Sequence, residues 1–212
     1  MKVNLLTYTN NPIETIYRAY KQCYAPGTAR EIKIPSSEEM AKFICKWMGK
    51  GHGSPIEHVS FTFSIEGVSR ALTHQLVRHR IASYSHQSQR YVDGNNFDFI
   101  VPKTWEEKAS SDWIKLYKKD IKRLYNYLIE LGVPKEDARY ILPNATTSNI
   151  VVTMNLRSLR HFYDERSCIH AQWEIREMAN KMMAEVKEII PFADYKAKKC
   201  GITCFECGGK NE

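Results

Sequence analysis

Three short strand patterns are separated along this chain by much longer helical patterns. Residues 1–9, 59–66 and 150–154 form the alternating or apolar runs that are typical of strands. Helical periodicity fills most of the intervening segments and predicts one long helix from Trp105 to Leu131. Strands separated by several helices indicate an α+β or mixed α/β domain. We therefore expect a central, largely antiparallel sheet flanked by helices, with a helical extension.

Helix starts are marked by capping residues. Ser36 and Glu39 have the spacing of a capping box, and Ser69 precedes a short helical pattern that ends near His79. After the last strand pattern, a further helix is predicted over about Leu156–Tyr163. These signals fix where the main helices begin more firmly than where they end.

The composition is that of a globular protein. Of 212 residues, 43% are hydrophobic and 26% are charged, which excludes a disordered chain. We expect a single domain over residues 1–212, with 191–212 as a flexible tail. Neither a secretory signal nor an apolar run of about 18 residues is present, so we expect a soluble cytoplasmic protein with no membrane partner. The six cysteines should then be reduced, with Cys23 and Cys45 buried in helices.

An excess of basic residues points to anionic partners. Lys and Arg number 31 against 24 Asp and Glu, a formal net charge of +7. Nucleotides, phosphorylated cofactors and nucleic acid all satisfy such a charge. Nucleic-acid binding is the main alternative to an enzyme, but the basic residues are spread over predicted helices and loops without a basic tail. We therefore expect no nucleic-acid partner.

A cysteine cluster near the end of the chain raises the question of a metal. Cys200, Cys204 and Cys207 are spaced almost as zinc ligands are. A structural zinc takes four ligands, and no nearby histidine completes this set. We expect no metal site, and the sequence leaves open whether this cluster binds one.

The most informative segment is the polar run Arg78–Tyr91. It holds three arginines, two histidines and three serines, and no acidic residue. Gln75 lies one helical turn before Arg78, so both side chains can project from one face. Guanidinium groups suit phosphate, and hydroxyls and amides suit a ribose and a base. A solvated basic surface is the alternative, but Ile81, Ala82 and two tyrosines make the run only partly hydrophilic.

Three blocks of this sequence together resemble one enzyme family. Arg78-His79-Arg80 is followed after seven residues by Ser88, His52–His58 precedes a strand, and Asn155–Phe162 continues through Arg166 to Glu174. In their order along the chain, the three blocks resemble those of flavin-dependent thymidylate synthases, over about residues 52–176. The resemblance implies a homotetrameric methyltransferase with shared active sites. It implies conversion of dUMP to dTMP, with 5,10-methylenetetrahydrofolate as carbon donor, reduced FAD as hydride donor and NADPH as reductant of the flavin. No Gly-x-Gly-x-x-Gly motif marks a site for NADPH.

The resemblance also implies site residues. Arg166 would be the catalytic residue, and His52 and its loop would face flavin or folate. The implied FAD ligands are Ser54, Arg78, His79, Arg80, His86, Asn155, Arg157 and His161. The implied dUMP ligands are Gln75, Arg78, His86, Gln87, Ser88, Gln89, Arg90, Arg139 and Arg166. Many relatives have asparagine and glutamate where this chain has Ser85 and His86, and asparagine where it has His161, so the roles of these two histidines stay open.

The chemistry explains why arginine is needed. Carbon 5 of uracil is a poor nucleophile, and a permanent cation near N3 and the adjacent carbonyl would stabilise the charge that develops as carbon 5 attacks. Arg166 suits this electrostatic role because its guanidinium stays protonated. Ser88 has two interpretations: a nucleophile, or a hydrogen-bond donor to the dUMP phosphate. We favour the second, because arginines and no acid surround it in the sequence. Cys168, close to Arg166, is interpreted as a packing residue.

Overall fold

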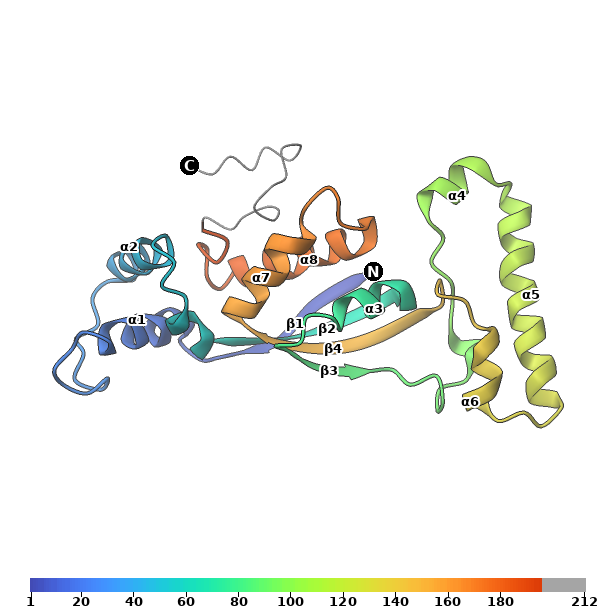
Figure 1. Ribbon diagram of the computed structural model, residues 1–212, viewed down its shortest axis with the longest axis horizontal. Coiled ribbons are helices and arrows are strands. Elements are labelled where there is room, and N and C mark those ends of the chain that lie inside the picture. Colours follow the sequence, from blue (N-terminus) through green and yellow to red (C-terminus); the bar gives the residue numbers. More distant parts are fainter. Residues whose placement is uncertain (196–212) are drawn as a thin grey trace. The chain divides into compact units, whose positions relative to one another are not determined.

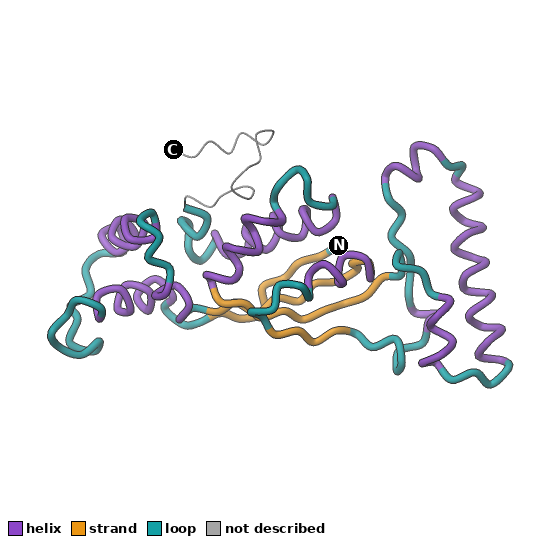
Figure 2. Tube along the Cα trace, viewed as in Figure 1, coloured by secondary structure: helices purple, strands orange, loops and turns teal. Residues whose placement is uncertain are grey.

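The computed structural model describes residues 1–195, apart from the side chain of Asn95 (Figures 1 and 2). Cys200, Cys204 and Cys207 lie outside the described residues. The strands are β1 (Lys2–Tyr8), β2 (Ser60–Ser69), β3 (Ser83–His86) and β4 (Thr147–Asn155). The α-helices are α1 (Pro12–Gln22), α2 (Ser37–Met48), α3 (Arg70–Leu76), α4 (Lys103–Lys108), α5 (Ser111–Glu130), α6 (Lys135–Ala138), α7 (Leu156–Arg166) and α8 (Trp173–Lys187). Short 3-10 helices are η1 (Ser54–His58), η2 (Gly94–Asn96) and η3 (Arg139–Ile141).

The strands pair into one antiparallel sheet in the order β1-β2-β4-β3. On β2, Phe61, Phe63 and Ile65 are fully buried and alternate with half-buried polar residues. On β4, every second residue from Ile150 to Met154 is buried. This alternation buries one face of each strand and matches a two-residue side-chain period. The predicted α+β class with an antiparallel sheet is confirmed.

Contacts divide the chain into two compact units. The first unit comprises Met1–Lys2, Ile65–Arg78 and Ser85–Ile150. The second unit comprises Val3–Ser64, His79–Tyr84 and, among the described residues, 151–195. The boundary falls within all four strands, β1, β2, β3 and β4, so both units take up part of the sheet.

In the second unit, α7 has one apolar face and one polar face. Leu156, Leu159 and Phe162 are fully buried, and α7 packs against α8 and η1. Arg157 and His161 lie on the polar face and are exposed. Burial of a large aliphatic or aromatic side chain contributes about 1.5–3 kcal/mol. The apolar face thus fixes the rotation of the helix and decides which side chains its polar face presents.

In the first unit, the long helix α5 is only weakly buried. Tyr125 is its single buried residue, and a Cβ added at Gly94 would lie 2.6 Å from the ring of Tyr125. Position 94 therefore requires glycine for steric reasons. Several large apolar side chains of this region are exposed to solvent: Trp113, Leu116, Leu124, Tyr127 and Leu131.

The prediction of one helix from Trp105 to Leu131 is wrong. The chain breaks at Ala109, which is extended (φ −102°, ψ 146°), and a new helix begins after Ser110. The Ser110 hydroxyl accepts a hydrogen bond from the backbone N–H of Trp113 at 3.2 Å. This N-cap satisfies a donor that would otherwise lack a partner, so the serine starts a helix rather than continuing one.

Two further predictions concern the burial of two cysteines and the start of the expected tail. The prediction that Cys23 and Cys45 are buried is wrong: Cys23 is exposed and Cys45 is half-buried. At the start of the expected tail, residues 191–195 form turns, and Ala193 is fully buried. The Arg160 guanidinium donates to the carbonyl oxygens of Ala193 and Tyr195.

The predicted capping box at Ser36 is present, and it can be tested. The Ser36 hydroxyl accepts from the Glu39 N–H at 3.3 Å, and the Glu39 carboxylate accepts from the Ser36 N–H at 3.1 Å. Ser36→Ala should lower the free energy of unfolding by about 0.5–2 kcal/mol in urea denaturation. Ser37→Ala is the matched control, because Ser37 begins the helix and makes no cap bond. Equal stability of the two variants would contradict a stabilising role for the cap.

Candidate active site

Asn155 links β4 to α7 and fixes the start of the helix. Its backbone is extended (φ −74°, ψ 164°), and its side-chain oxygen accepts from the Ser158 N–H at 2.8 Å. The oxygen is thus committed to the N-cap, which leaves the side-chain NH₂ as the group available to a ligand. α7 then extends to Arg166, three residues past the predicted end at Tyr163.

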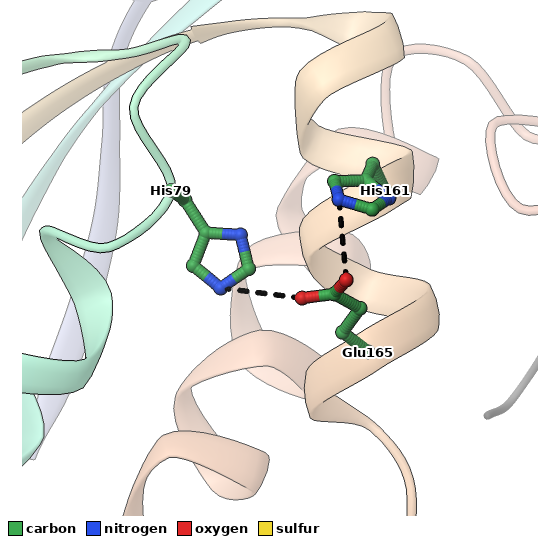
Figure 3. Close-up of side chains that lie close together, drawn as sticks. All are labelled: His79, His161 and Glu165. Atoms are coloured by element: carbon green, nitrogen blue, oxygen red, sulfur yellow. Dashed lines mark ion pairs between the residues drawn. The ribbon is translucent and has the colours of Figure 1, made fainter. Parts of the chain in front are cut away.

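The C-terminal half of α7 meets His79 in the second unit (Figure 3). The Arg166 Nε–H donates to His79 Nε2 at 3.0 Å. Glu165 lies close to both histidines of this cluster: its carboxylate oxygens are 3.2 Å from His161 Nε2 and 3.8 Å from His79 Nε2. The structure therefore brings together three of the expected site residues, Arg166, His79 and His161, and adds Glu165, which was not among them.

His79 is neutral at pH 7. Its side chain is 9% exposed. Burial, reinforced by the positive charge of Arg166, lowers the pKa of His79 to about 4. Because Arg166 can only donate, His79 Nε2 must carry a lone pair and the proton must lie on Nδ1. The approach of Glu165 to the same nitrogen is therefore a contact with a neutral ring and not an ion pair.

The loop before β2 lies beside the start of α7. The Tyr20 hydroxyl donates to the carbonyl oxygen of His52 at 2.6 Å, and the exposed Arg157 pairs with Glu57 at 2.5 Å. A cavity of about 210 Å³ opens here. It is lined by Met48, Gly51, Gly53, Ile56, Arg157, Arg160, His161 and Asp164. Ser54, the other expected FAD ligand of this loop, is exposed at the first position of η1.

The residues of the second unit fit an anionic, ring-containing cofactor such as FAD. His52 Nδ1 is buried without a hydrogen-bond partner among the described residues, and a ligand atom would remove the cost of that buried polar atom. Arg80 is exposed, and its side chain makes no hydrogen bond or ion pair within residues 1–195. The cavity is smaller than the roughly 300–1,000 Å³ of a typical ligand pocket, so it could hold only part of a dinucleotide.

In the first unit, His86 is held by two side chains. Its Nδ1 lies 3.1 Å from Arg70 Nη1, and its Nε2 lies 2.8 Å from the Ser148 hydroxyl. Burial lowers the pKa of His86 to about 4, and the charges of Arg70 and His74 act in the same direction. Since Arg70 only donates, Nδ1 accepts, and Nε2–H donates to Ser148. Arg70 and Ser148 were missed because neither lies in a motif.

Three further expected dUMP ligands of the first unit, Ser88, Arg90 and Arg139, are connected by hydrogen bonds, two of them through Glu136. Glu136 accepts from Arg90 at 3.0 Å through its carboxylate and from Arg139 at 3.0 Å through its carbonyl oxygen. The Ser88 hydroxyl accepts from the Arg90 N–H at 3.2 Å.

The remaining expected ligands of the first unit are three glutamines and Arg78, which have different surroundings. The Gln87 side-chain oxygen accepts from the Asn149 N–H at 3.2 Å, and Gln89 is buried. Gln75 is half-buried on α3. Arg78 is exposed, and its guanidinium has no hydrogen bond or ion pair in the described part of the chain. Such an arginine is open to an anionic ligand.

Comparisons with known proteins agree with one family. The family model described as "Thymidylate synthase complementing protein" (Thy1) matches residues 4–192. A flavin-dependent thymidylate synthase of Nitratidesulfovibrio vulgaris is 47% identical, covering 93% of this chain and 87% of the relative. Relatives of the same name from Clostridium tetani and Pyrococcus abyssi are 46% and 42% identical, covering 90% and 98% of this chain and 84% and 88% of their own lengths.

The fold agrees as well. A crystal structure of the flavin-dependent thymidylate synthase ThyX from Helicobacter pylori, complexed with FAD and dUMP, superposes with a TM-score of 0.75 at 21% identity. The match covers 94% of this chain and 100% of that one. Since the family model spans most of the chain and close relatives cover nearly all of it, the chain belongs to the family of flavin-dependent thymidylate synthases.

Proposed function

We propose that this chain methylates dUMP to dTMP, with 5,10-methylenetetrahydrofolate as carbon donor and FAD as the bound cofactor. The flavin supplies the hydride for the reduction and is itself reduced by NADPH. Thymidylate synthase activity and flavin dependence follow from the family. The folate, the NADPH and the residue roles are the parts that this proposal adds.

The observation that carries the proposal is the hydrogen bond between Arg166 and His79. It uses the Arg166 Nε–H and leaves both terminal nitrogens of the guanidinium without a partner among the described residues. These two nitrogens form a planar fork of donors suited to the carbonyl oxygen beside N3 of a pyrimidine. Because His79 is neutral, it orients the guanidinium without neutralising it.

Arg166 then acts by electrostatic stabilisation. Negative charge that develops on the uracil carbonyl as carbon 5 attacks would lie against a fixed cation. A neutral histidine is well suited to hold this cation, since a carboxylate in its place would weaken the field at the substrate. Glu165 lies near the cluster but is 45% exposed, so water screens much of its charge.

Binding of dUMP and FAD is assigned to arginines and polar side chains. In the first unit, Arg78, Arg90 and Arg139 would bind the dUMP phosphate, with Ser88 as a hydrogen-bond donor. Gln75, Gln87 and Gln89 would complete the dUMP site. For FAD we assign Ser54, Arg78, His79, Arg80, Asn155 and Arg157. His86 and His161 are assigned to the site without a specified contact.

We further propose a cytoplasmic homotetramer whose subunits share active sites. The exposed apolar side chains of α5, from Trp113 (49% exposed) to Tyr127 (58% exposed), support burial against another subunit. Among the described residues, no helix combines the length and hydropathy needed to cross a bilayer.

The proposal is tested with the purified chain. Supplied with FAD, it should show stoichiometric flavin absorbance and should form dTMP from dUMP, 5,10-methylenetetrahydrofolate and NADPH. Omission of the folate should abolish dTMP formation while NADPH still reduces the flavin. Failure to form dTMP in the presence of excess FAD would reject the proposed function.

The role of Arg166 is tested by Arg166→Lys. Lysine keeps the charge but loses the fork, so kcat and kcat/KM should fall together, by roughly 100-fold or more, with FAD affinity nearly unchanged. The measurement is steady-state dTMP formation at varied dUMP, beside a flavin titration. Arg176→Lys is the control, since Arg176 lies on α8 and donates to the Ile169 carbonyl. A rise in KM alone would show a ground-state contact instead.

Burial of His79 predicts a pH dependence of stability. Its pKa is about 4 when folded and 6.5 when unfolded, so the unfolded chain binds more protons between these values. The free energy of unfolding should fall as pH drops from 6.5 towards 4, by at most about 1.4 kcal/mol per pH unit for this histidine. Urea denaturation of His79→Gln should show a shallower decline. The exposed His58→Gln should keep the wild-type slope, and equal slopes for all three proteins would contradict the prediction.

A further inference from the structure

The His79, His161 and Glu165 side chains form a cluster with the donor atoms of a metal site (Figure 3). One ligand atom from each of the three lies within 4.8 Å of the other two. His161 and Glu165 are four residues apart on α7, so the helix presents both on one face. His79 approaches from a separate segment of the second unit and is nearly buried.

The spacing suits a tetrahedral ion. Zinc–nitrogen and zinc–oxygen bonds of about 2.0–2.2 Å place neighbouring ligand atoms about 3.3–3.6 Å apart. The observed separations are 3.2 Å between His161 Nε2 and Glu165 Oε1 and 3.8 Å between His79 Nε2 and Glu165 Oε2, both close to this value. The exposed fraction of His161, 67%, leaves a path from solvent for the ion and for a water as fourth ligand. Two imidazoles and one carboxylate are a common ligand set for zinc.

We propose that His79, His161 and Glu165 bind a divalent transition-metal ion such as Zn²⁺, with water in the remaining position. The ion and Arg166 compete for the same lone pair, because Arg166 donates to His79 Nε2 in the metal-free arrangement. Metal binding therefore releases Arg166 from His79. Since that contact orients the guanidinium in the proposed function, the ion inhibits dTMP formation.

The metal site itself does not depend on the proposed function, so binding is measured directly. Co²⁺ replaces Zn²⁺ as a spectroscopic probe and is titrated into the full-length chain freed of flavin. Nitrogen and oxygen ligands give visible d–d bands, whereas cysteine thiolates add a charge-transfer band in the near ultraviolet. We expect visible bands that saturate near one ion per chain.

Two variants and one control identify the ligands. Glu165→Gln and His161→Ala alter exposed side chains, so the fold should persist, and each should weaken Co²⁺ binding by roughly 10–100-fold or more. His58→Ala removes an exposed histidine elsewhere in the second unit and should leave the titration unchanged. Three results would each overturn the proposed metal site. These are unchanged Co²⁺ binding in both cluster variants, no Co²⁺ binding to the wild type, and a spectrum that shows thiolate bands alone.

Inhibition provides the separate functional readout. Zn²⁺ should inhibit dTMP formation by the FAD-loaded wild type, and chelation should reverse it. Glu165→Gln, which leaves Arg166 and His79 in place, should need at least about tenfold more Zn²⁺ for the same inhibition. If this variant were as sensitive to Zn²⁺ as the wild type, the proposed competition at His79 would be overturned. If the wild type formed no dTMP even without added metal, the proposed function would be rejected, and the Co²⁺ titration would still test the metal site.

Discussion

Burial of one face of α7 is the constraint on which the second unit's site depends. Leu156, Leu159 and Phe162 are fully buried, which fixes the rotation of the helix about its axis. With the rotation set and the helix start fixed by the Asn155 cap, every polar side chain further along has a determined direction. The position of Arg166 beside His79 therefore follows from apolar packing about one to three turns earlier in α7, and not from the polar residues themselves.

A neutral histidine is a suitable partner for the arginine that we propose as catalytic. A buried carboxylate would bind the guanidinium more strongly but would cancel the charge that the proposed role of Arg166 requires. Burial keeps His79 uncharged at pH 7, and the Nε2 lone pair still fixes the direction of the Arg166 Nε–H. The same packing that makes protonation of His79 costly thus keeps the positive charge of Arg166 available.

Much of the fold followed from the sequence, and the failures have local causes. The alternation in β2 and the Ser36 capping box were predicted from patterns a few residues long. His79 and Arg166 were named as site residues through the family resemblance, and their roles remain predictions. Glu165 was missed because the periodicity predicted a helix that stops at Tyr163, whereas α7 continues to Arg166. Without that last turn, the four-residue relation between His161 and Glu165 is invisible. The strand Ser83–His86 was also missed, since its pairing with a distant strand leaves little trace in its own polar residues.

The arginines that we assign to ligands are more exposed than Arg160, which donates hydrogen bonds to the backbone. Arg160 is half-buried and donates to two backbone carbonyls, which cannot move away without unfolding the chain near Ala193. Arg90 and Arg157 instead pair with exposed glutamates, and both arginine side chains are more than half exposed. Exposed ion pairs contribute only about 0–1 kcal/mol. A phosphate can therefore replace either glutamate at little energetic cost, so these ion pairs keep the guanidinium groups in position while leaving them available to an anionic ligand.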